Sequence, residues 1–378
     1  MRKSGINMER VKKENRSLIL KCINDNGPIS RKDIAKATGL TPASVTQITT
    51  GLIAENLLEE LGTVSENKGL AGRKKVLLDL NRKYGYVLSI NIESETTTVA
   101  ICDIKGCILN EGALINSFDT DKKSVPEIFL GFVIKKANSL IQKTDSSVSG
   151  LIKCVSIGVP GIVDKKRGVS VHAYGIWERE VYLRSVFNDA FDLPVLVENN
   201  VDAFATAEII YGAGKNFDSL LVIKWGPGIG STIVIDNKVY EGRHGKTAEL
   251  GHVIVEKNGK KCSCGKRGCL ETILSVGNLS KIKRKEEIDY SIDLFARSIV
   301  NTCSIIAPNR IILAGPLFAN EEMRDKLVSF CSEYDSSYDG KRILYTSLSG
   351  KESYIGPVAV YYLTVLGDGV SGPICRSF

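Results

Sequence analysis

The sequence predicts an α/β protein in which an N-terminal winged helix-turn-helix is followed by two α/β lobes of related topology. Short amphipathic segments separated by glycine and proline fill the first 60 residues, which is typical of a bundle of small helices. Apolar strand-turn-strand patterns then occur twice, at 87–109 and at 220–240, and each indicates an antiparallel hairpin. The expected units are residues 1–82 for the winged helix-turn-helix, 83–197 for the first lobe, completed by a C-terminal helix at 356–378, and 198–355 for the second lobe.

Three helices are expected in the N-terminal unit. Residues 11–26 carry an apolar stripe and stop before a Gly-Pro pair, which ends helices. Ser30 is a good N-cap for a second helix, and Gly39 ends it. Thr41 is the N-cap of a third helix, which opens with proline and runs to about residue 56. Two short helices joined around a glycine form a helix-turn-helix.

A basic loop between two strands completes this unit as a wing. The strands are expected at 57–61 and 76–80, and the loop between them holds Arg73 and Lys74. Residues 1–83 contain 16 basic and 9 acidic side chains, so the whole net charge of +7 lies in this part of the chain. Because a basic module on a neutral body is typical of nucleic-acid-binding proteins, double-stranded DNA is the expected partner.

Small and amide side chains on the outer face of the third helix can approach base edges in the major groove. The expected DNA-binding residues are Thr41, Ala43, Ser44, Thr46 and Gln47 in this helix, and Arg73 and Lys74 in the wing. The alternative is a three-helix protein-interaction module, which the concentration of positive charge disfavours.

A cluster of soft metal ligands lies between Glu249 and Glu271. Its members are His252, Cys262, Cys264 and Cys269. One imidazole and three thiolates are the ligand set of a closed, structural zinc site, so Zn²⁺ is the expected cofactor. The alternatives are a disulfide or incidental cysteines. The N-terminus is polar rather than signal-like, and no apolar run is long enough for a membrane span; we therefore expect a cytoplasmic protein, in which disulfides are rare.

The same stretch resembles the signature of the ROK family of bacterial sugar kinases and sugar-responsive repressors, in which Glu-x-Gly-His precedes Cys-x-Cys-Gly-x-x-Gly-Cys-x-Glu. The resemblance implies the duplicated two-lobe fold of sugar kinases, hexokinase and actin, with ligands in the cleft between the lobes. It also implies that His252 both ligates zinc and contacts a sugar, while the flanking glutamates accept hydrogen bonds from sugar hydroxyls. The implied sugar-binding residues are Gly161, Asn199, Asn200, Glu249, His252 and Glu271. The wing arginine of ROK repressors enters the minor groove, and Arg73 matches it.

Three positions determine whether a member of this family can transfer phosphate. The family's catalytic aspartate corresponds to Asn200, and an amide has no basic site for a hydroxyl proton. In the first phosphate loop, Asn91 replaces an aspartate and Glu93 replaces a glycine. Pro227 removes a backbone N–H donor from the second, glycine-rich loop. Asp202 lies two positions after Asn200 in an expected helix, and we expect it to point to a different face.

These patterns predict a sugar-responsive repressor of carbohydrate-utilisation genes that has no catalytic residues and has lost phosphoryl transfer. A single winged helix-turn-helix reads few base pairs, so a homodimer or a dimer of dimers on a palindromic operator is expected, nucleoid-associated when bound. The effector is a monosaccharide or a sugar derivative, whose identity the sequence leaves open. The alternatives are an ATP-dependent sugar kinase with an appended DNA-binding domain, and a regulator that binds another protein instead of sugar.

Overall fold

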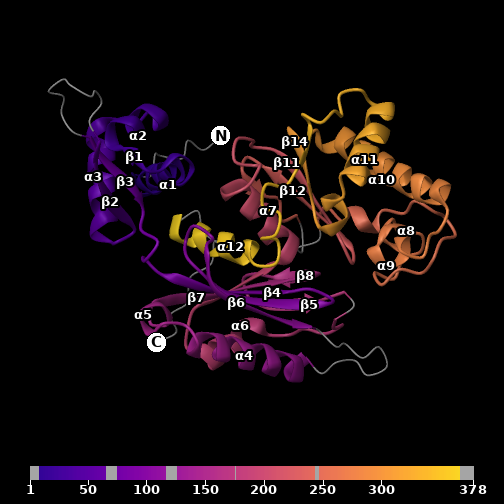
Figure 1. Cartoon of the computed structure of the whole chain (residues 1–378), viewed down its shortest axis with the longest axis horizontal. Coiled ribbons are helices and arrows are strands. Elements are labelled where there is room, and N and C mark those ends of the chain that lie inside the picture. The colour runs from indigo at the N-terminus through magenta and orange to yellow at the C-terminus, as the bar shows by residue number, and fades with distance from the viewer. Residues whose placement is uncertain (1–7, 65–74, 116–125, 175, 243–246, 367–378) are drawn as a thin grey trace, which may run out of the picture.

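The structure of the protein is a computed structural model that describes residues 8–64, 75–115, 126–174, 176–242 and 247–366. Figure 1 shows a small N-terminal body in indigo, a first lobe below it and a second lobe beside both. The expected α/β architecture, with a winged helix-turn-helix before two lobes, is confirmed.

The N-terminal unit combines three helices with a small sheet. The helices are α1 (Met8–Asn26), α2 (Arg31–Thr38) and α3 (Pro42–Ala54), and the sheet consists of β1 (Ile29–Ser30), β3 (Lys75–Leu80) and β2 (Leu58–Val64), in that order.

The helix caps of this unit are those that the sequence predicts. The Ser30 hydroxyl accepts a hydrogen bond from the Asp33 N–H at 3.3 Å, and the Thr41 hydroxyl accepts one from the Ser44 N–H at 3.2 Å. Gly39 adopts the left-handed conformation that ends α2, with φ of 71°. Strand β1 was not expected. The basic loop with Arg73 and Lys74 falls within residues 65–74, outside the described residues.

The first lobe is built on a five-stranded sheet in the order β10-β7-β4-β5-β6. These strands are β4 (Tyr86–Ile92), β5 (Thr96–Cys102), β6 (Ile108–Ile115), β7 (Ile152–Val159) and β10 (Val195–Asn199). Helices α4 (Pro126–Gln142) and α6 (Leu183–Phe191) pack against one face of it. The short α5 (Ser146–Ser149) and the hairpin of β8 (Ile162–Asp164) and β9 (Val169–His172) complete the lobe.

The second lobe repeats this plan. Its sheet has the order β13-β12-β11-β14-β15, and β11 pairs antiparallel with β12 and parallel with β14, as β4 does with β5 and β7. The expected internal repeat is therefore confirmed. The strands are β11 (Leu220–Trp225), β12 (Ile229–Ile235), β13 (Lys238–Val239), β14 (Arg310–Ala314) and β15 (Ile343–Tyr345). The helices are α8 (Glu271–Leu274), α9 (Val276–Leu279), α10 (Lys285–Ile306) and α11 (Glu321–Tyr334), with 3₁₀ turns at Leu250–His252 and Pro316–Ala319.

Helices α7 (Asn200–Ile210) and α12 (Ile355–Leu366) lie between the two sheets (Figure 1). Every residue of α7 from Ala203 onward is buried. Helix α12 packs on α7, β4 and β7, so it lies against the sheet of the first lobe. Strand β10 extends to Asn199, so the first sheet reaches two residues beyond the boundary expected after residue 197.

The winged helix-turn-helix packs directly on this central helix pair. Ile19, Leu20 and Ile23 of α1 belong to the same buried cluster as residues of α7 and α12. The Asn24 amide donates to the carbonyl of Ile210, the last residue of α7, at 2.9 Å, and so satisfies one of the carbonyls that a helix end leaves unpaired.

An ion pair provides a second attachment, between the wing and the first lobe. The Nζ atom of Lys105, in the turn between β5 and β6, lies 2.6 Å from both carboxylate oxygens of Asp79 on β3. Both side chains are largely buried. The N-terminal unit is thus joined to the body by apolar packing and by polar contacts.

Candidate functional site

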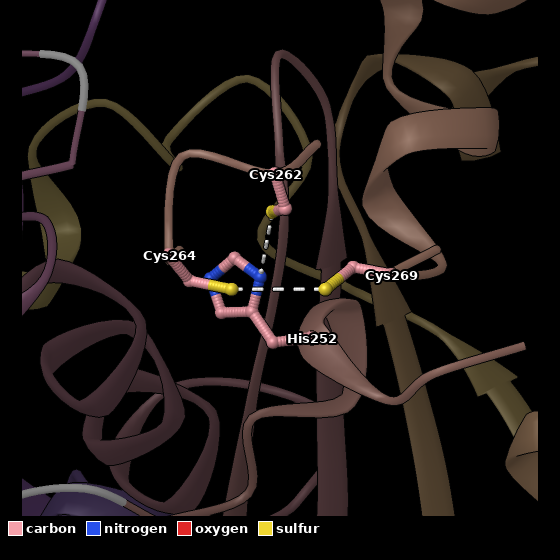
Figure 2. A group of neighbouring side chains, drawn as sticks. All are labelled: His252, Cys262, Cys264 and Cys269. Atoms are coloured by element: carbon pink, nitrogen blue, oxygen red, sulfur yellow. Dashed lines mark hydrogen bonds between the residues drawn. The ribbon is translucent and has the colours of Figure 1, made fainter. Parts of the chain in front are cut away.

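The four expected metal ligands converge in the second lobe (Figure 2). The ligand atoms of His252, Cys262, Cys264 and Cys269 all lie within 4.8 Å of one another. The Cys262 sulfur is 3.5 Å from His252 Nδ1, and the sulfurs of Cys264 and Cys269 are 3.6 Å apart. A tetrahedral zinc ion with Zn–S bonds of about 2.3 Å requires ligand atoms about 3.5–3.8 Å apart. The donor set and its spacing therefore fit a closed, four-coordinate metal site.

The metal cluster also orients a histidine toward the space between the lobes. His252 Nδ1 faces the sulfurs, while Nε2 lies 3.8 Å from the Glu249 carboxylate. Burial lowers the pKa of His252, which favours the neutral imidazole that a metal binds. Tyr174 of the first lobe packs edge-on against this imidazole, with ring centroids 5.3 Å apart. The imidazole is thus held from both lobes.

A cavity of about 520 Å³ lies between the lobes, and its walls contain all six of the sugar-binding residues that the resemblance implies. They are Gly161, Asn199, Asn200, Glu249, His252 and Glu271. The structure thus brings together residues that are up to 110 positions apart in the sequence. A cavity of this volume is in the range of small-molecule sites.

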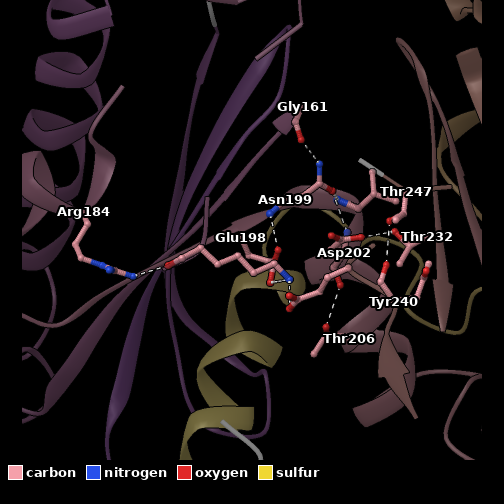
Figure 3. Close-up of polar contacts among 12 residues, drawn as sticks. Gly161, Arg184, Glu198, Asn199, Asp202, Thr206, Thr232, Tyr240 and Thr247 are labelled. Atoms are coloured by element: carbon pink, nitrogen blue, oxygen red, sulfur yellow. Dashed lines mark hydrogen bonds and ion pairs between the residues drawn. The ribbon is translucent and has the colours of Figure 1, made fainter. Parts of the chain in front are cut away.

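Asn199 fixes the geometry of the first-lobe wall. Its Nδ2 donates to the Gly161 carbonyl at 2.7 Å, and its Oδ1 accepts from the backbone N–H groups of Val201 and Asp202 at 2.8 and 3.1 Å (Figure 3). Asn199 is therefore the N-cap of α7 and holds the Gly161 turn beside the helix. Gly161 has φ of 85°, and a Cβ there would lie 2.1 Å from the His172 carbonyl oxygen, so only glycine fits.

Glu271 fixes the opposite wall. Its Oε2 accepts from the Ile229 N–H at 2.9 Å, and a Cβ on Gly228 would lie 2.6 Å from the same oxygen. Burial raises the pKa of Glu271. In the same turn the Gly226 N–H donates to the Gly228 carbonyl at 2.9 Å. The Gly226 N–H is thus engaged within the turn, the Ile229 N–H is engaged by the Glu271 side chain, and Pro227 has no N–H, so these three positions offer no free donor to an anion.

A buried polar network lies behind the first turn of α7 (Figure 3). Lys165 Nζ lies 2.6 Å from Glu198 Oε2, and the Thr232 hydroxyl donates to Asp202 Oδ1 at 2.8 Å. Burial raises the pKa of Glu198 to about 7 and raises that of Asp202 as well. Asp202 lines the cavity, which corrects the expectation that it points away. The reason is that the residues of a helix's first turn surround the end of its axis, so that several of them border a site placed there.

Sequence reasoning missed several cavity residues. Besides Asp202, they include Tyr174, Lys224, Ser231 and Thr247. A signal existed for Lys224, which is a charged residue in the otherwise apolar strand Leu220–Trp225. The other three carry no local signal, because they reach the cavity only through the packing of the two lobes.

The outer face of α3 is accessible in the structure. Thr41, Ala43, Thr46 and Gln47 are exposed and Ser44 is half-buried, whereas Val45, Thr49 and Leu52 point into the core. The Thr41 hydroxyl bonds to Ser44, and that of Thr46 bonds to the Pro42 carbonyl at 2.8 Å. The helix therefore presents an uncharged face of small and amide side chains that begins at its N-terminus.

Comparison with known proteins agrees with this architecture. The profile of the ROK family matches residues 87–293, which is more than half of the chain. The chain belongs to the ROK family. The profile of the MarR family matches residues 13–61 of this ROK protein, which lie in the winged helix-turn-helix.

Known ROK proteins include both repressors and kinases that resemble this chain. A xylose repressor from Bacillus spizizenii is 33% identical over 277 residues, 73% of this chain and 70% of the relative. A solved ROK family transcriptional regulator, described as a homologue of the E. coli MLC protein, is 23% identical and covers 95% of this chain and 100% of its own, with a TM-score of 0.72. A ROK hexokinase from Thermus thermophilus is 20% identical and covers 75% of this chain and 100% of its own, with a TM-score of 0.59. The two structures show the shared fold.

Within the part of this ROK protein that the structure describes, no helix is both long and apolar enough to cross a bilayer.

The metal cluster leads to a first prediction. A Zn²⁺ ion held by this cluster would contribute folding free energy and would fix His252, which lines the cavity. Cys264→Ser should therefore lower the zinc content of the purified protein, lower its melting temperature and abolish binding of a sugar in the cavity. Zinc content, thermal unfolding and sugar titration measure the three effects. Cys107→Ser is the matched control, since Cys107 is exposed and outside the cluster. Full sugar affinity in a metal-free Cys264→Ser protein would contradict the role given to His252.

Proposed function

We propose that this ROK protein is a sugar-responsive transcriptional repressor of carbohydrate-utilisation genes. The observation that carries the proposal is that α7 begins in the cavity and ends against the winged helix-turn-helix: Asn200 lines the cavity and the carbonyl of Ile210 accepts the Asn24 amide. The name of the Bacillus relative, a xylose repressor, supports the same function and makes D-xylose the first effector to test.

The cavity walls suit a polyhydroxylated ligand. Glu249 and Glu271 are acceptors for sugar hydroxyls, Asn200 is a donor and an acceptor, and His252 Nε2 faces the same space. We assign sugar binding to these four residues and to the Gly161 backbone. Asn199 acts mainly through Gly161 and α7, because both ends of its amide are engaged there. A structural Zn²⁺ held by the Cys₃His cluster would fix His252 in place.

Phosphoryl transfer requires a base, phosphate donors and a metal-binding carboxylate. Asn200 has no basic site for a proton, and Asn91 stands where the family resemblance implies an aspartate. In the second turn the Gly226 N–H bonds to the Gly228 carbonyl and the Ile229 N–H bonds to Glu271. These features support a cavity that binds sugar without catalysis.

One observation favours the alternative of a sugar kinase, namely that Asp202 lines the cavity as a carboxylate. Its Oδ1 atom accepts a hydrogen bond from the Thr232 hydroxyl, so this oxygen is engaged in the network behind α7. We therefore assign it a structural role.

DNA binding is assigned to the winged helix-turn-helix, residues 1–82. Thr41, Ala43, Ser44, Thr46 and Gln47, at the N-terminal end of α3, would contact bases in the major groove. Arg73 of the wing would enter the minor groove, and Lys74 beside it would contact the DNA. Residues 83–197 with 356–378, and residues 198–355, form the two lobes that hold the effector. A homodimer or dimer of dimers in the cytoplasm, bound to a palindromic operator, provides the two recognition helices that specificity requires.

The coupling between cavity and DNA is the second prediction. Sugar should weaken operator binding by about 5- to 150-fold, the range of typical coupling free energies. Glu271→Ala should leave operator affinity intact and erase the response to sugar, because it removes a wall residue of the cavity. Arg73→Ala should weaken operator binding and leave sugar affinity unchanged. Fluorescence anisotropy with an operator duplex, combined with a titration of D-xylose and other aldoses, measures both affinities.

Two results would count against these assignments. A full sugar response in Glu271→Ala would reject the cavity as the effector site, and normal operator affinity in Arg73→Ala would reject the wing.

A third prediction separates the repressor from the kinase. The protein with ATP, Mg²⁺ and saturating aldose should show no turnover in a coupled ADP-release assay, because no base is placed at position 200. Asn200→Asp alone should not restore activity, since Glu93 still occupies the first loop. Sustained ADP release by the wild-type protein, lost in Asp202→Asn, would establish the kinase alternative.

A further inference from the structure

The two hairpin turns that border the cavity come from equivalent places in the two lobes. Residues 93–95 join β4 to β5, residues 226–228 join β11 to β12, and both turns line the cavity. In each lobe the first strand of the hairpin also pairs in parallel with the next strand of its sheet. A direct link between these two hairpins would fix the separation of the lobes at this end of the cavity.

An ion pair makes that link. The Nζ of Lys224, on β11, contacts the Oε1 of Glu93, and the Asn91 amide donates to the same oxygen at 3.1 Å. The side chains of Lys224 and Glu93 are 14% and 29% exposed. Solvent therefore screens this pair less than an ordinary surface pair. The contact crosses from the second lobe to the first within the cavity wall.

The charges around this link disfavour an anionic ligand. Lys224 is the only lysine or arginine among the described residues that line the cavity. The carboxylates among the same lining residues are those of Glu93, Glu95, Asp202, Glu249 and Glu271. A phosphate group would compete with Glu93 for Lys224, and separating the members of this partly buried pair is costly. Hydroxyl groups need only hydrogen-bond partners, which these carboxylates provide.

We propose that the Glu93–Lys224 ion pair ties the lobes together in the position where a nucleotide would otherwise bridge them, so that the cavity binds an unphosphorylated, uncharged sugar without any nucleotide. The identity of the ligand as a sugar rests on the proposed function; the tie itself does not. Glu93 and Lys224 are positioning residues in this account. They hold the two lobes at a fixed separation before the ligand binds. This preorganisation reduces the conformational entropy that the protein loses on binding.

The first test uses variants of the pair, with D-xylose and D-glucose as probes. Glu93→Gln and Lys224→Met each remove the attraction with little change in size, and each should weaken binding of the better probe about 5- to 10-fold. The charge swap Glu93→Lys with Lys224→Glu should recover most of the loss. Asp289→Asn is the matched control, because Asp289 pairs with Lys326 at similar exposure, 34% and 21%, but between two helices of the second lobe. Unchanged affinity in both single variants would overturn the proposal.

Hydrogen exchange tests the tie without any sugar. Breaking a link between the lobes should speed amide exchange in the turns of both lobes, at 93–96 and at 226–229, even though Glu93→Gln alters only one of them. The charge swap should restore slow exchange in both, and Asp289→Asn should change neither. Faster exchange confined to the mutated hairpin would show that the pair does not connect the lobes.

The ligand class has its own test, by calorimetry with matched pairs of compounds. D-xylose and D-glucose should bind at least about 10-fold more tightly than D-xylose 5-phosphate and D-glucose 6-phosphate, and ATP with Mg²⁺ should not raise their affinity. Tighter binding of a phosphate ester, or sugar binding that depends on ATP, would overturn the proposal. If no aldose or ester binds, the proposed function fails, and the exchange experiment still decides whether the ion pair ties the lobes.

Discussion

The side chain of Asn199 makes the hydrogen bonds on which the arrangement of the cavity depends most. It caps α7, whose first turn forms one wall, and at the same time holds the Gly161 carbonyl, which brings the backbone of a second segment to that wall. Helix α7 is buried along most of its length and ends on α1. No flexible loop lies between its first turn and that contact, so a displacement of the first turn moves the far end of the helix as well. Close-packed helices move as units, so a ligand that shifts the first turn of α7 also acts on the surface that carries the winged helix-turn-helix.

The described lining of the cavity holds five carboxylates and one lysine, a composition that suits hydroxyl groups better than a phosphate. The metal cluster, Glu249 and Glu271 form one end of the cavity, and the Glu93–Lys224 pair with the Pro227 turn forms another. In a phosphoryl-transfer site the second region would be rich in donors and cations. Here the described residues of that region make the Glu93–Lys224 ion pair, one hydrogen bond within the Pro227 turn, and a hydrogen bond from the Ile229 N–H to Glu271. A cavity that can bind a sugar but not a phosphate donor suits the proposed sensor, because a sensor must respond to a sugar without consuming it.

Local signals made much of the fold predictable. The caps Ser30 and Thr41 and the C-terminal Gly39 mark helix ends through hydrogen bonds and backbone conformation that depend on neighbouring residues only. The hairpin repeat could be found because strand alternation is also local. Helices α6, α10 and α11 and the β8–β9 hairpin were not anticipated.

Side-chain contacts between segments far apart in the chain could not be predicted from the sequence. The cavity residues implied by family resemblance do converge, but the Glu93–Lys224 pair joins positions 131 residues apart. The one sequence signal for this pair is the position of Lys224, a charged residue in the otherwise apolar strand β11. Asp202 was misplaced because helical spacing was applied to a first turn, where residues on several faces border the same space.

In the proposed function, the binding of sugar in the cavity and the binding of operator to the winged helix-turn-helix are coupled through the protein. Thermodynamic linkage makes this coupling reciprocal. The most direct measurement is a calorimetric titration of the wild-type protein with its best aldose, once alone and once saturated with an operator duplex. The account predicts that the duplex weakens sugar binding by the same factor by which sugar weakens operator binding. Equal sugar affinity with and without the duplex would contradict it.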